Sequence, residues 1–198
     1  VDAANRRNTI KQPCGPIEST NPCGEIPLHP YDSCNLGSID LEKFYDKKVN
    51  DINYESLGHI IDTAVRFLDN VIDANNYPLP EIAQMSRDTT RRIGLGVMGW
   101  ADLLFRMNLS YGSDESLSLA KKVQAFITDK AAKASEEIGK EKGNFGAWET
   151  SSYGEINRPM RNSFHTTVAP TGTISIIADC SGGIEPLYAL AFKREVMP

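Results

Sequence analysis

Three side chains that could do chemistry together stand at alternate positions near the start of the chain: the amide of Asn21, the thiol of Cys23 and the carboxylate of Glu25. In an extended segment alternate residues point the same way, so the three groups are predicted to meet in one small volume. A thiol can act as a nucleophile or in one-electron chemistry, a carboxylate can take a proton and an amide can orient a hydroxyl. The alternative is a turn in which these side chains only satisfy backbone groups.

A second candidate site follows a predicted strand in the last third of the chain. The pattern indicates a strand over residues 163–169, then a tight turn, then a helix that begins at Ile174. This arrangement aims free backbone N–H groups and the positive end of a helix at one point, which suits a phosphate. Thr171, Thr173 and Ser175 add hydroxyl donors, but the lysine of a Walker loop is absent. An ordinary helix cap that uses threonine is the alternative.

Composition indicates one globular domain and excludes some partners. The chain has 198 residues, of which 40% are hydrophobic and 24% charged, and a net charge of −5. Since it has no long basic run, a nucleic-acid polymer or an anionic membrane is not the expected partner. No apolar run reaches the roughly 18 residues of a membrane helix, and the first residues lack the apolar core of a signal peptide. We therefore expect a cytoplasmic protein.

The cysteines do not follow a metal-binding pattern. Cys14, Cys23, Cys34 and Cys180 include no close C-x-x-C pair, and no histidine stands beside them at zinc-finger spacing. We predict no metal bound by this segment. Permanent disulfides are also not expected in a cytosolic protein, so the thiols should be catalytic or incidental. We interpret Cys14 as incidental and Cys180 as structural.

The elements that position these groups alternate between strands and helices. Short apolar runs predict strands over residues 33–41 and 93–97, the second leading into a helix over 98–106. Residues 54–74 have the spacing of an amphipathic helix, which Asn53 can cap. Strands that alternate with helices indicate the α/β class with parallel pairing.

The remaining segments are less regular. Residues 1–20 are predicted to be a connecting loop or a cut edge, residues 80–85 a short helix, and residues 143–161 a loop-rich excursion. A long helix is predicted over 115–140, capped by Ser113 or Asp114. Its apolar face is predicted to contain Leu117, Ala120, Val123, Phe126, Ile127 and Ala131.

Three glycines also match a motif by spacing. Gly94, Gly96 and Gly99 fit the dinucleotide-binding fingerprint, but the acidic residue expected about 20 positions later has only loose candidates such as Asp114. We therefore interpret these glycines as sites of close backbone packing.

Four motifs together resemble one family. Asn21-Pro22-Cys23-Gly24-Glu25, Asp32-Ser33-Cys34-Asn35-Leu36-Gly37-Ser38-Ile39, Arg92-Ile93-Gly94-Leu95-Gly96-Val97-Met98-Gly99 and Ala169-Pro170-Thr171-Gly172-Thr173-Ile174-Ser175 resemble, in the family's order, the large catalytic subunit of ribonucleotide reductase. The sequences of these motifs are most similar to those of the adenosylcobalamin-dependent class II enzymes. The resemblance covers about residues 18 to 192.

The resemblance implies a fold and an assembly. Residues 1–198 would form about the second half of a ten-stranded α/β barrel, with a central finger loop near 19–28 and a phosphate loop near 170–175. The rest of the barrel would be a partner of this segment. The first of the paired redox cysteines would lie upstream of Val1.

The resemblance also implies a reaction, the reduction of ribonucleoside di- or triphosphates for DNA synthesis. Cys23 would become a thiyl radical with adenosylcobalamin as the suspected cofactor, Glu25 would take the 3′-hydroxyl proton, and Asn21 would hold substrate oxygens. Cys34 would be a reducing cysteine served by a thioredoxin-like or dithiol reductant. The substrate phosphates would bind to Pro170, Thr171, Gly172, Thr173, Ile174 and Ser175.

Other functions share parts of this pattern. A nucleotide-binding module without catalysis would keep residues 170–175 but would not need Asn21, Cys23 and Glu25. A glycyl-radical enzyme would share the barrel and the finger cysteine but not the phosphate loop. Iron- or manganese-dependent reductases share the Cys23 motif, so the radical generator stays open.

Overall fold

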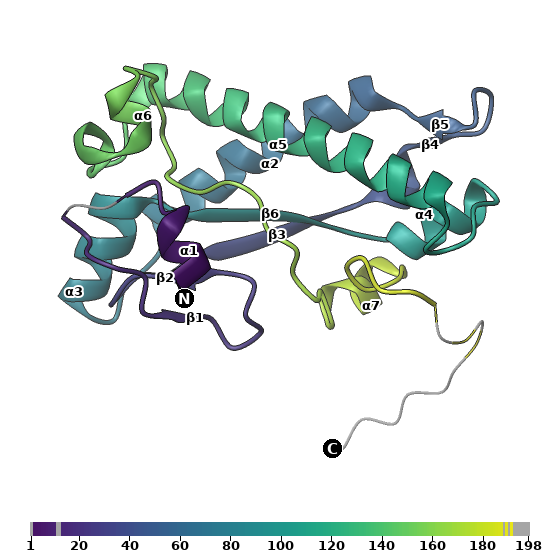
Figure 1. The fold of residues 1–198 in the computed structure, drawn as a ribbon, viewed down its shortest axis with the longest axis horizontal. Helices are drawn as coiled ribbons and strands as arrows, with labels where there is room; N and C mark the ends of the chain where they lie inside the picture. Colours follow the sequence, from purple (N-terminus) through teal and green to yellow (C-terminus); the bar gives the residue numbers. More distant parts are fainter. Residues whose placement is uncertain (1, 11–12, 188, 190, 192–198) are drawn as a thin grey trace.

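Two parallel strands form the centre of the structure. The computed structural model describes residues 2–10, 13–187, 189 and 191. Strands β3 (Asn35–Asp40) and β6 (Ile93–Met98) pair in parallel, with Asn35 opposite Ile93 and Asp40 opposite Met98 (Figure 1). Both strands were predicted from their short apolar runs, and both predictions are confirmed.

A third segment runs along the free edge of β6. The Leu95 N–H donates to His165 O at 2.8 Å, and the Thr167 N–H donates to Leu95 O at 3.0 Å. The prediction of a regular strand over residues 163–169 is nevertheless wrong in extent, because only the bridge between Leu95 and Thr166 has ladder geometry. The segment is extended backbone with few ladder bonds.

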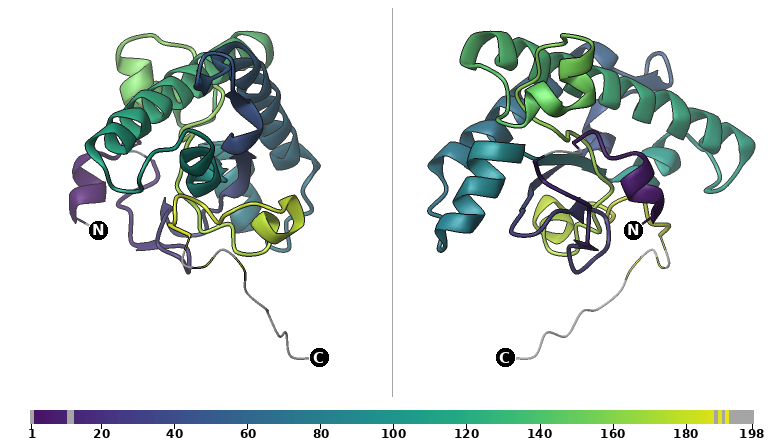
Figure 2. Two further views of the ribbon diagram at one scale, coloured as in Figure 1. Left: turned by 90° about the vertical axis from the view of Figure 1, so that its right-hand side faces the viewer. Right: turned by 60° about the vertical axis from the view of Figure 1, so that its left-hand side comes forward.

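Two long helices cover one face of this sheet. Helix α2 (Tyr54–Ala74) connects β3 to β6, and helix α5 (Asp114–Lys142) follows β6. Figure 1 shows both helices on one side of the strands, with the hairpin of β1 (Ser19–Thr20) and β2 (Pro27–Leu28) on the other. Two further views in Figure 2 show the same layers. The main core lies between the helices and the strands, and it includes Leu57, Ile61, Val65, Ile93, Leu95, Leu103, Val123 and Ile127.

The ends of the long helices were predicted more accurately than the faces that they bury. Helix α2 has the predicted bounds, and the Asn53 side chain accepts the Ser56 N–H at 3.0 Å. Helix α5 is capped by Ser113 rather than Asp114. The predicted α5 face is partly wrong, because Leu117 is 52% exposed while its neighbour Ser116 is buried. The buried stripe instead runs through Leu119, Val123, Ile127, Ala131, Ala134 and Ile138.

The remaining elements are short. The predicted helix at 80–85 is longer, because α3 (Pro80–Ala83) continues into a π-helix, η2 (Gln84–Thr90). Residues 1–20, predicted as a loop, contain α1 (Asp2–Arg6) as well as β1. The others are η1 (Leu41–Phe44), β4 (Tyr45–Asp46), β5 (Asp51–Ile52), α4 (Trp100–Arg106), η3 (Trp148–Thr150), α6 (Ser152–Glu155) and α7 (Ile174–Ala178). No helix among the described residues is long and apolar enough to cross a membrane.

A buried polar cluster connects helix α2 to the amino ends of β6 and of the 163–169 segment. The Asp69 carboxylate on α2 is fully buried and accepts from Arg91 Nη2 at 2.7 Å, Asn162 Nδ2 at 3.0 Å and Arg161 Nε at 3.3 Å. Arg91 has left-handed backbone, with φ 48°, where η2 ends and β6 is about to begin. One carboxylate therefore joins α2, the start of β6 and the start of the 163–169 segment.

The substitution Asp69→Asn is expected to lower the free energy of unfolding by about 3 kcal/mol or more, because the buried Arg91 guanidinium keeps its charge and loses its buried anionic partner. Urea unfolding of the full-length protein measures this loss. The matched control is Asp73→Asn, which breaks a pair between Arg91 and a carboxylate that is 46% exposed and is expected to cost less than about 1 kcal/mol. Equal losses in the two variants would contradict the role given to Asp69.

Candidate active site

The finger, residues 19–28, is a hairpin closed by a tight turn. Ser19 pairs with Leu28 and Thr20 with Pro27. Between them the Asn21 N–H donates to Ile26 O at 3.1 Å, and the Gly24 N–H donates to Asn21 O at 3.0 Å. Gly24 has a φ of 86°, which favours glycine. The predicted extended alternation of Asn21, Cys23 and Glu25 is therefore wrong, because the segment turns back on itself within these residues.

The turn gives the three predicted residues different environments. The Asn21 side-chain oxygen accepts the Ile26 N–H at 2.9 Å, so this oxygen holds the turn, as the structural alternative had it. Cys23 is exposed and carries a free thiol. Buried Ile26 anchors the turn beneath it.

One carboxylate oxygen of Glu25, Oε2, is buried without a hydrogen-bond partner among the described residues, which is unusual in a protein. Buried carboxylate oxygens are normally satisfied, so an unpaired one indicates a missing donor, such as a ligand hydroxyl. The Glu25 backbone carbonyl accepts from the Thr167 hydroxyl at 3.1 Å, which ties the turn to the 163–169 segment.

Cys34 lies beneath the finger, just before β3. Its Sγ is 3.3 Å from the point that a Cβ on Gly94 would occupy. Burial raises the pKa of this thiol to about 12, the charge of Arg92 opposes that rise, and the charges of Asp32 and Glu25 add to it. The thiol is therefore protonated at neutral pH, and the carboxylate of Glu25 is near enough to influence it.

The loop at residues 170–175 offers backbone donors rather than the three predicted hydroxyls. Thr171 is buried with a φ of 56°, and its Oγ1 accepts the Gly183 N–H at 2.7 Å. Ser175 is buried too, so of the three hydroxyls only that of Thr173 is exposed. Thr173 makes no side-chain cap bond to α7, which disfavours the helix-cap alternative.

The free donors of this loop are consecutive. Among the described residues, no acceptor is recorded for the backbone N–H groups of Gly172, Thr173 and Ile174. The loop follows the carboxyl end of the 163–169 segment, and Figure 1 shows α7 on the same side of the sheet as the finger. Consecutive free N–H groups suit an anion.

Comparison with known proteins identifies the family of the chain. The chain matches the family described as "Ribonucleotide reductase, barrel domain" over residues 1–159 and 155–198. The chain belongs to this family. Vitamin B12-dependent ribonucleoside-diphosphate reductases are similar to it: that of Thermoplasma acidophilum is 52% identical over the whole chain and that of Mycobacterium tuberculosis 46%. The chain spans only 25% and 28% of those two proteins.

A solved structure is also similar in fold. The Actinobacillus ureae class Id ribonucleotide reductase alpha subunit superposes with a TM-score of 0.70 at 24% identity, covering 93% of this chain and 34% of that one. The predicted fold class, part of the reductase α/β barrel, is confirmed by this likeness and by the family match.

In this reductase barrel domain the glycines of β6 act in packing, as predicted. A Cβ on Gly94 would collide with the Leu36 side chain, and a Cβ on Gly96 would lie 2.8 Å from Thr167 O. Gly99, with a φ of 69°, leaves room for the Asp40 carboxylate. The glycines therefore let neighbouring segments pack closely against this face of the strand.

The two other cysteines of the reductase domain lie away from the finger tip. Cys14 packs with Ile10, Phe145, Ala147 and Met160, and burial and the charge of Asp32 raise its pKa to about 11. Cys180 lies beside Gly99 and Asp40, at the carboxyl end of β3. Because Cys34 is at the other end of this six-residue strand, roughly 17 Å separates the two. Cys180 therefore cannot pair with Cys34.

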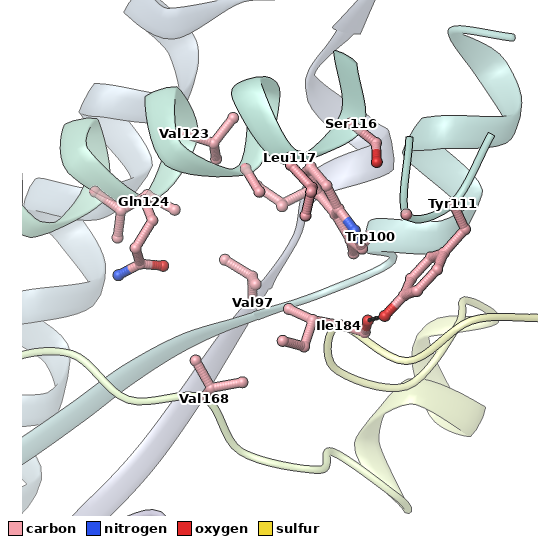
Figure 3. Close-up of a pocket in the computed structure, with 13 residues that line it drawn as sticks. Val97, Trp100, Tyr111, Ser116, Leu117, Val123, Gln124, Val168 and Ile184 are labelled. Carbon is pink, nitrogen blue, oxygen red and sulfur yellow. Dashed lines mark hydrogen bonds between the residues drawn. The ribbon is translucent and has the colours of Figure 1, made fainter. Parts of the chain in front are cut away.

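An apolar pocket on the helix side of the sheet is a different kind of site. Figure 3 shows Val97, Trp100, Leu117, Val168 and Ile184 around a cavity of about 270 Å³. Its wall is closed by a hydrogen bond from Tyr111 Oη to Ile184 O at 2.8 Å. Val168 lines this pocket, whereas its neighbour Thr167 points to the finger on the opposite side of the sheet. The sheet therefore separates the pocket from the finger.

Some functional features were not predicted. Thr167 was not singled out, although its place two residues before Ala169 puts both on one face of an extended segment. The turn at 180–183 was not singled out either. The Ser181 N–H donates to Asp102 Oδ2 at 2.6 Å, Ser181 O accepts from the Gly99 N–H at 2.8 Å, and the Gly183 N–H donates to Thr171 Oγ1, so this turn ties the 170–175 loop to the end of β6. No group of three metal ligands is found among the described residues.

Iodoacetamide at pH 8 is expected to modify Cys23 at least about 100-fold faster than Cys34. Cys23 is exposed, whereas the rise in the Cys34 pKa from 9.0 to about 12 reduces its thiolate about a thousandfold. Mass spectrometry of labelled peptides from the full-length protein, between pH 7 and pH 10, measures both rates.

The variant Glu25→Gln serves as the control for this experiment. Removing the Glu25 charge should lower the pKa of Cys34 and speed its labelling, while labelling of Cys14 stays unchanged. Labelling of Cys34 as fast as Cys23 would contradict the arrangement described here.

Proposed function

We propose that this chain is part of the catalytic barrel of a ribonucleotide reductase, which replaces the 2′-hydroxyl of a ribonucleotide with hydrogen. The observation that carries the proposal is the finger turn. It presents the exposed Cys23 thiol beside Glu25, whose buried Oε2 has no partner among the described residues, above the protonated thiol of Cys34. A nucleotide-binding module without catalysis has no need for this arrangement.

The cofactor follows from the relatives and from one thiol of this chain. Relatives that are 46–52% identical are named vitamin B12-dependent, which supports adenosylcobalamin over an iron- or manganese-dependent generator. Bound adenosylcobalamin supplies the one-electron chemistry that converts a thiol to a thiyl radical. The Cys23 thiol fits this use because it is free and exposed.

The first half of the reaction uses the finger residues. The Cys23 thiyl radical takes the hydrogen atom from C3′ of the ribose, which restores the thiol and leaves a carbon radical. Glu25 accepts the proton of the 3′-hydroxyl and returns it when the product forms, and the 2′-hydroxyl leaves as water with a proton from one of the two reducing thiols. Asn21 contributes through its side-chain nitrogen, since its oxygen holds the turn.

The second half uses Cys34. Cys34 and a second thiol outside this chain give two electrons and two protons, and they become a disulfide. Cys23 then returns its hydrogen atom to C3′. The reaction balances as ribonucleotide and two thiols giving deoxyribonucleotide, water and a disulfide. A dithiol or thioredoxin-like reductant must reduce the disulfide before the next turnover.

The substrate phosphates are assigned to the 170–175 loop. Backbone N–H groups of Gly172, Thr173 and Ile174 and the exposed Thr173 hydroxyl would bind phosphate oxygens. Thr171 and Ser175 would act by shaping the loop, since both are buried. Relatives named as diphosphate reductases favour a diphosphate substrate over a triphosphate.

The rest of the barrel is the proposed structural partner. The outer edge of β3 and the adjoining face of α2 form an apolar cavity of about 380 Å³, lined by Leu36, Ile60, Ala64 and Phe67 among others. Phe67 is 65% exposed there. Such an edge requires a neighbouring strand and helix. We therefore expect the segment to be inactive when it is made alone.

Cys23→Ser in the full-length protein is expected to abolish deoxynucleotide formation and to preserve nucleotide binding. Serine is nearly isosteric, but its O–H bond is much harder to break homolytically. Chromatography of products and equilibrium dialysis of a labelled ribonucleotide measure the two properties. Cys180→Ser is the matched control and should keep turnover, because Cys180 lies away from the finger. Measurable deoxynucleotide from the Cys23 variant would refute the radical role.

Cys34→Ser is expected to divert the reaction rather than to stop it. Hydrogen abstraction by Cys23 does not need Cys34, but the dehydrated intermediate cannot be reduced and should release its base. Free base and deoxynucleotide are measured together after multiple turnovers. Normal deoxynucleotide yield with excess dithiol would remove Cys34 from the mechanism.

A further inference from the structure

One side chain links the finger to the strand beneath it. The Thr167 hydroxyl donates to the Glu25 carbonyl at 3.1 Å, and the residue is buried. This bond spans 142 positions of the sequence and joins the middle of the 163–169 segment to the finger turn. Its acceptor belongs to the residue that carries the proposed proton acceptor.

The backbone of Thr167 cannot shift easily. Its N–H donates to Leu95 O at 3.0 Å, and its carbonyl oxygen lies 2.8 Å from the point that a Cβ on Gly96 would occupy. Any residue other than glycine at position 96 would therefore displace it. Thr167 is a fixed point from which the finger is held.

The methyl group of Thr167 reaches toward the second thiol. Thr167 Cγ2 lies 3.1 Å, and Cys34 Sγ 3.3 Å, from the same point above Gly94. The two groups thus lie on one small area of the strand surface. One side chain contacts the finger through its hydroxyl and adjoins the reducing thiol through its methyl.

We propose that Thr167 is a positioning residue that sets the distance between the finger, with Cys23 and Glu25, and Cys34. This inference rests on the proposed function. Hydrogen abstraction occurs at the finger, whereas reduction needs Cys34 to reach the same ribose. An error in the spacing therefore affects the second step more than the first.

The variant Thr167→Val separates the two contacts, because valine keeps the methyl group and loses the hydroxyl. Thr167→Ser does the opposite, keeping the donor and losing the methyl. In Thr167→Val the Glu25 carbonyl loses its donor, and we expect free base released per deoxynucleotide formed to rise roughly fivefold, the equivalent of one neutral hydrogen bond. Release of tritium from 3′-labelled substrate, which reports on Cys23, should stay within about twofold of wild type.

The experiment compares wild type, Thr167→Val, Thr167→Ser and Thr166→Val in the full-length protein with adenosylcobalamin and a dithiol. The control is Thr166, whose side chain has no recorded hydrogen bond among the described residues. We expect the ratio of free base to deoxynucleotide to rise in Thr167→Val and to return toward the wild-type value in Thr167→Ser. If the ratio does not change in Thr167→Val, or if tritium release and deoxynucleotide formation fall equally, Thr167 is not a positioning residue.

A second readout does not depend on turnover. Amide hydrogen exchange at Ile26, whose N–H is bound within the finger turn to Asn21, should accelerate in Thr167→Val and not in Thr166→Val. If the Ile26 amide exchanges at the same rate in Thr167→Val and Thr166→Val, the proposal is overturned even if the wild type makes deoxynucleotide. Wild type that makes none refutes the proposed reaction, and accelerated exchange would still establish the link between Thr167 and the finger.

Discussion

The close approach of three segments over the inner face of β6 is the constraint on which the candidate site depends. Cys34, Leu36 and Thr167 lie over position 94, and Thr167 O lies over position 96, so a side chain at either position would displace its neighbours. Glycine makes a strand weaker by roughly 0.5–1 kcal/mol per residue. The outer face offsets this cost, since Ile93, Leu95 and Val97 are buried against the helices. One strand thus uses its outer face for stability, and its glycines let Cys34 and Thr167 pack closely on its inner face.

The sequence predicted the parts of the fold whose signals are local. Helix 54–74 was found with its bounds because apolar spacing and the Asn53 cap agree. The strand at 163–169 was overestimated, since its ladder depends on a neighbour that is far away in the sequence. The same reason explains Leu117: it is apolar and lies near the buried stripe, but the α5 face that meets the strands is decided by the packing of α2 and β6.

The residues of the candidate site were chosen by their types and by the family resemblance, and their predicted geometry was wrong. Family resemblance identified Asn21, Cys23 and Glu25, yet alternation in an extended segment was the wrong reason to bring them together. The turn depends on Gly24 at positive φ and on the Asn21 side chain, which sequence spacing does not reveal. Hydroxyls at 171 and 175 face inward because the glycine turn at 182–183 packs against the loop. Such contacts across the chain decide which donors remain free.

The unequal exposure of the thiols also determines how oxidants reach the molecule. Oxidation by peroxide requires an accessible sulfur and proceeds faster with more thiolate. Cys14 is buried and Cys34 is only partly exposed, and their raised pKa values of about 11 and about 12 leave little thiolate on either. Cys23 is the exposed cysteine of the four, so oxidative damage should start at the residue to which the proposed reaction assigns the radical. Oxidation of Cys23 to a sulfinic acid would be irreversible without a dedicated repair enzyme. If Cys23 carries the proposed thiyl radical, the exposure that lets the thiol reach a substrate also leaves it open to oxidants.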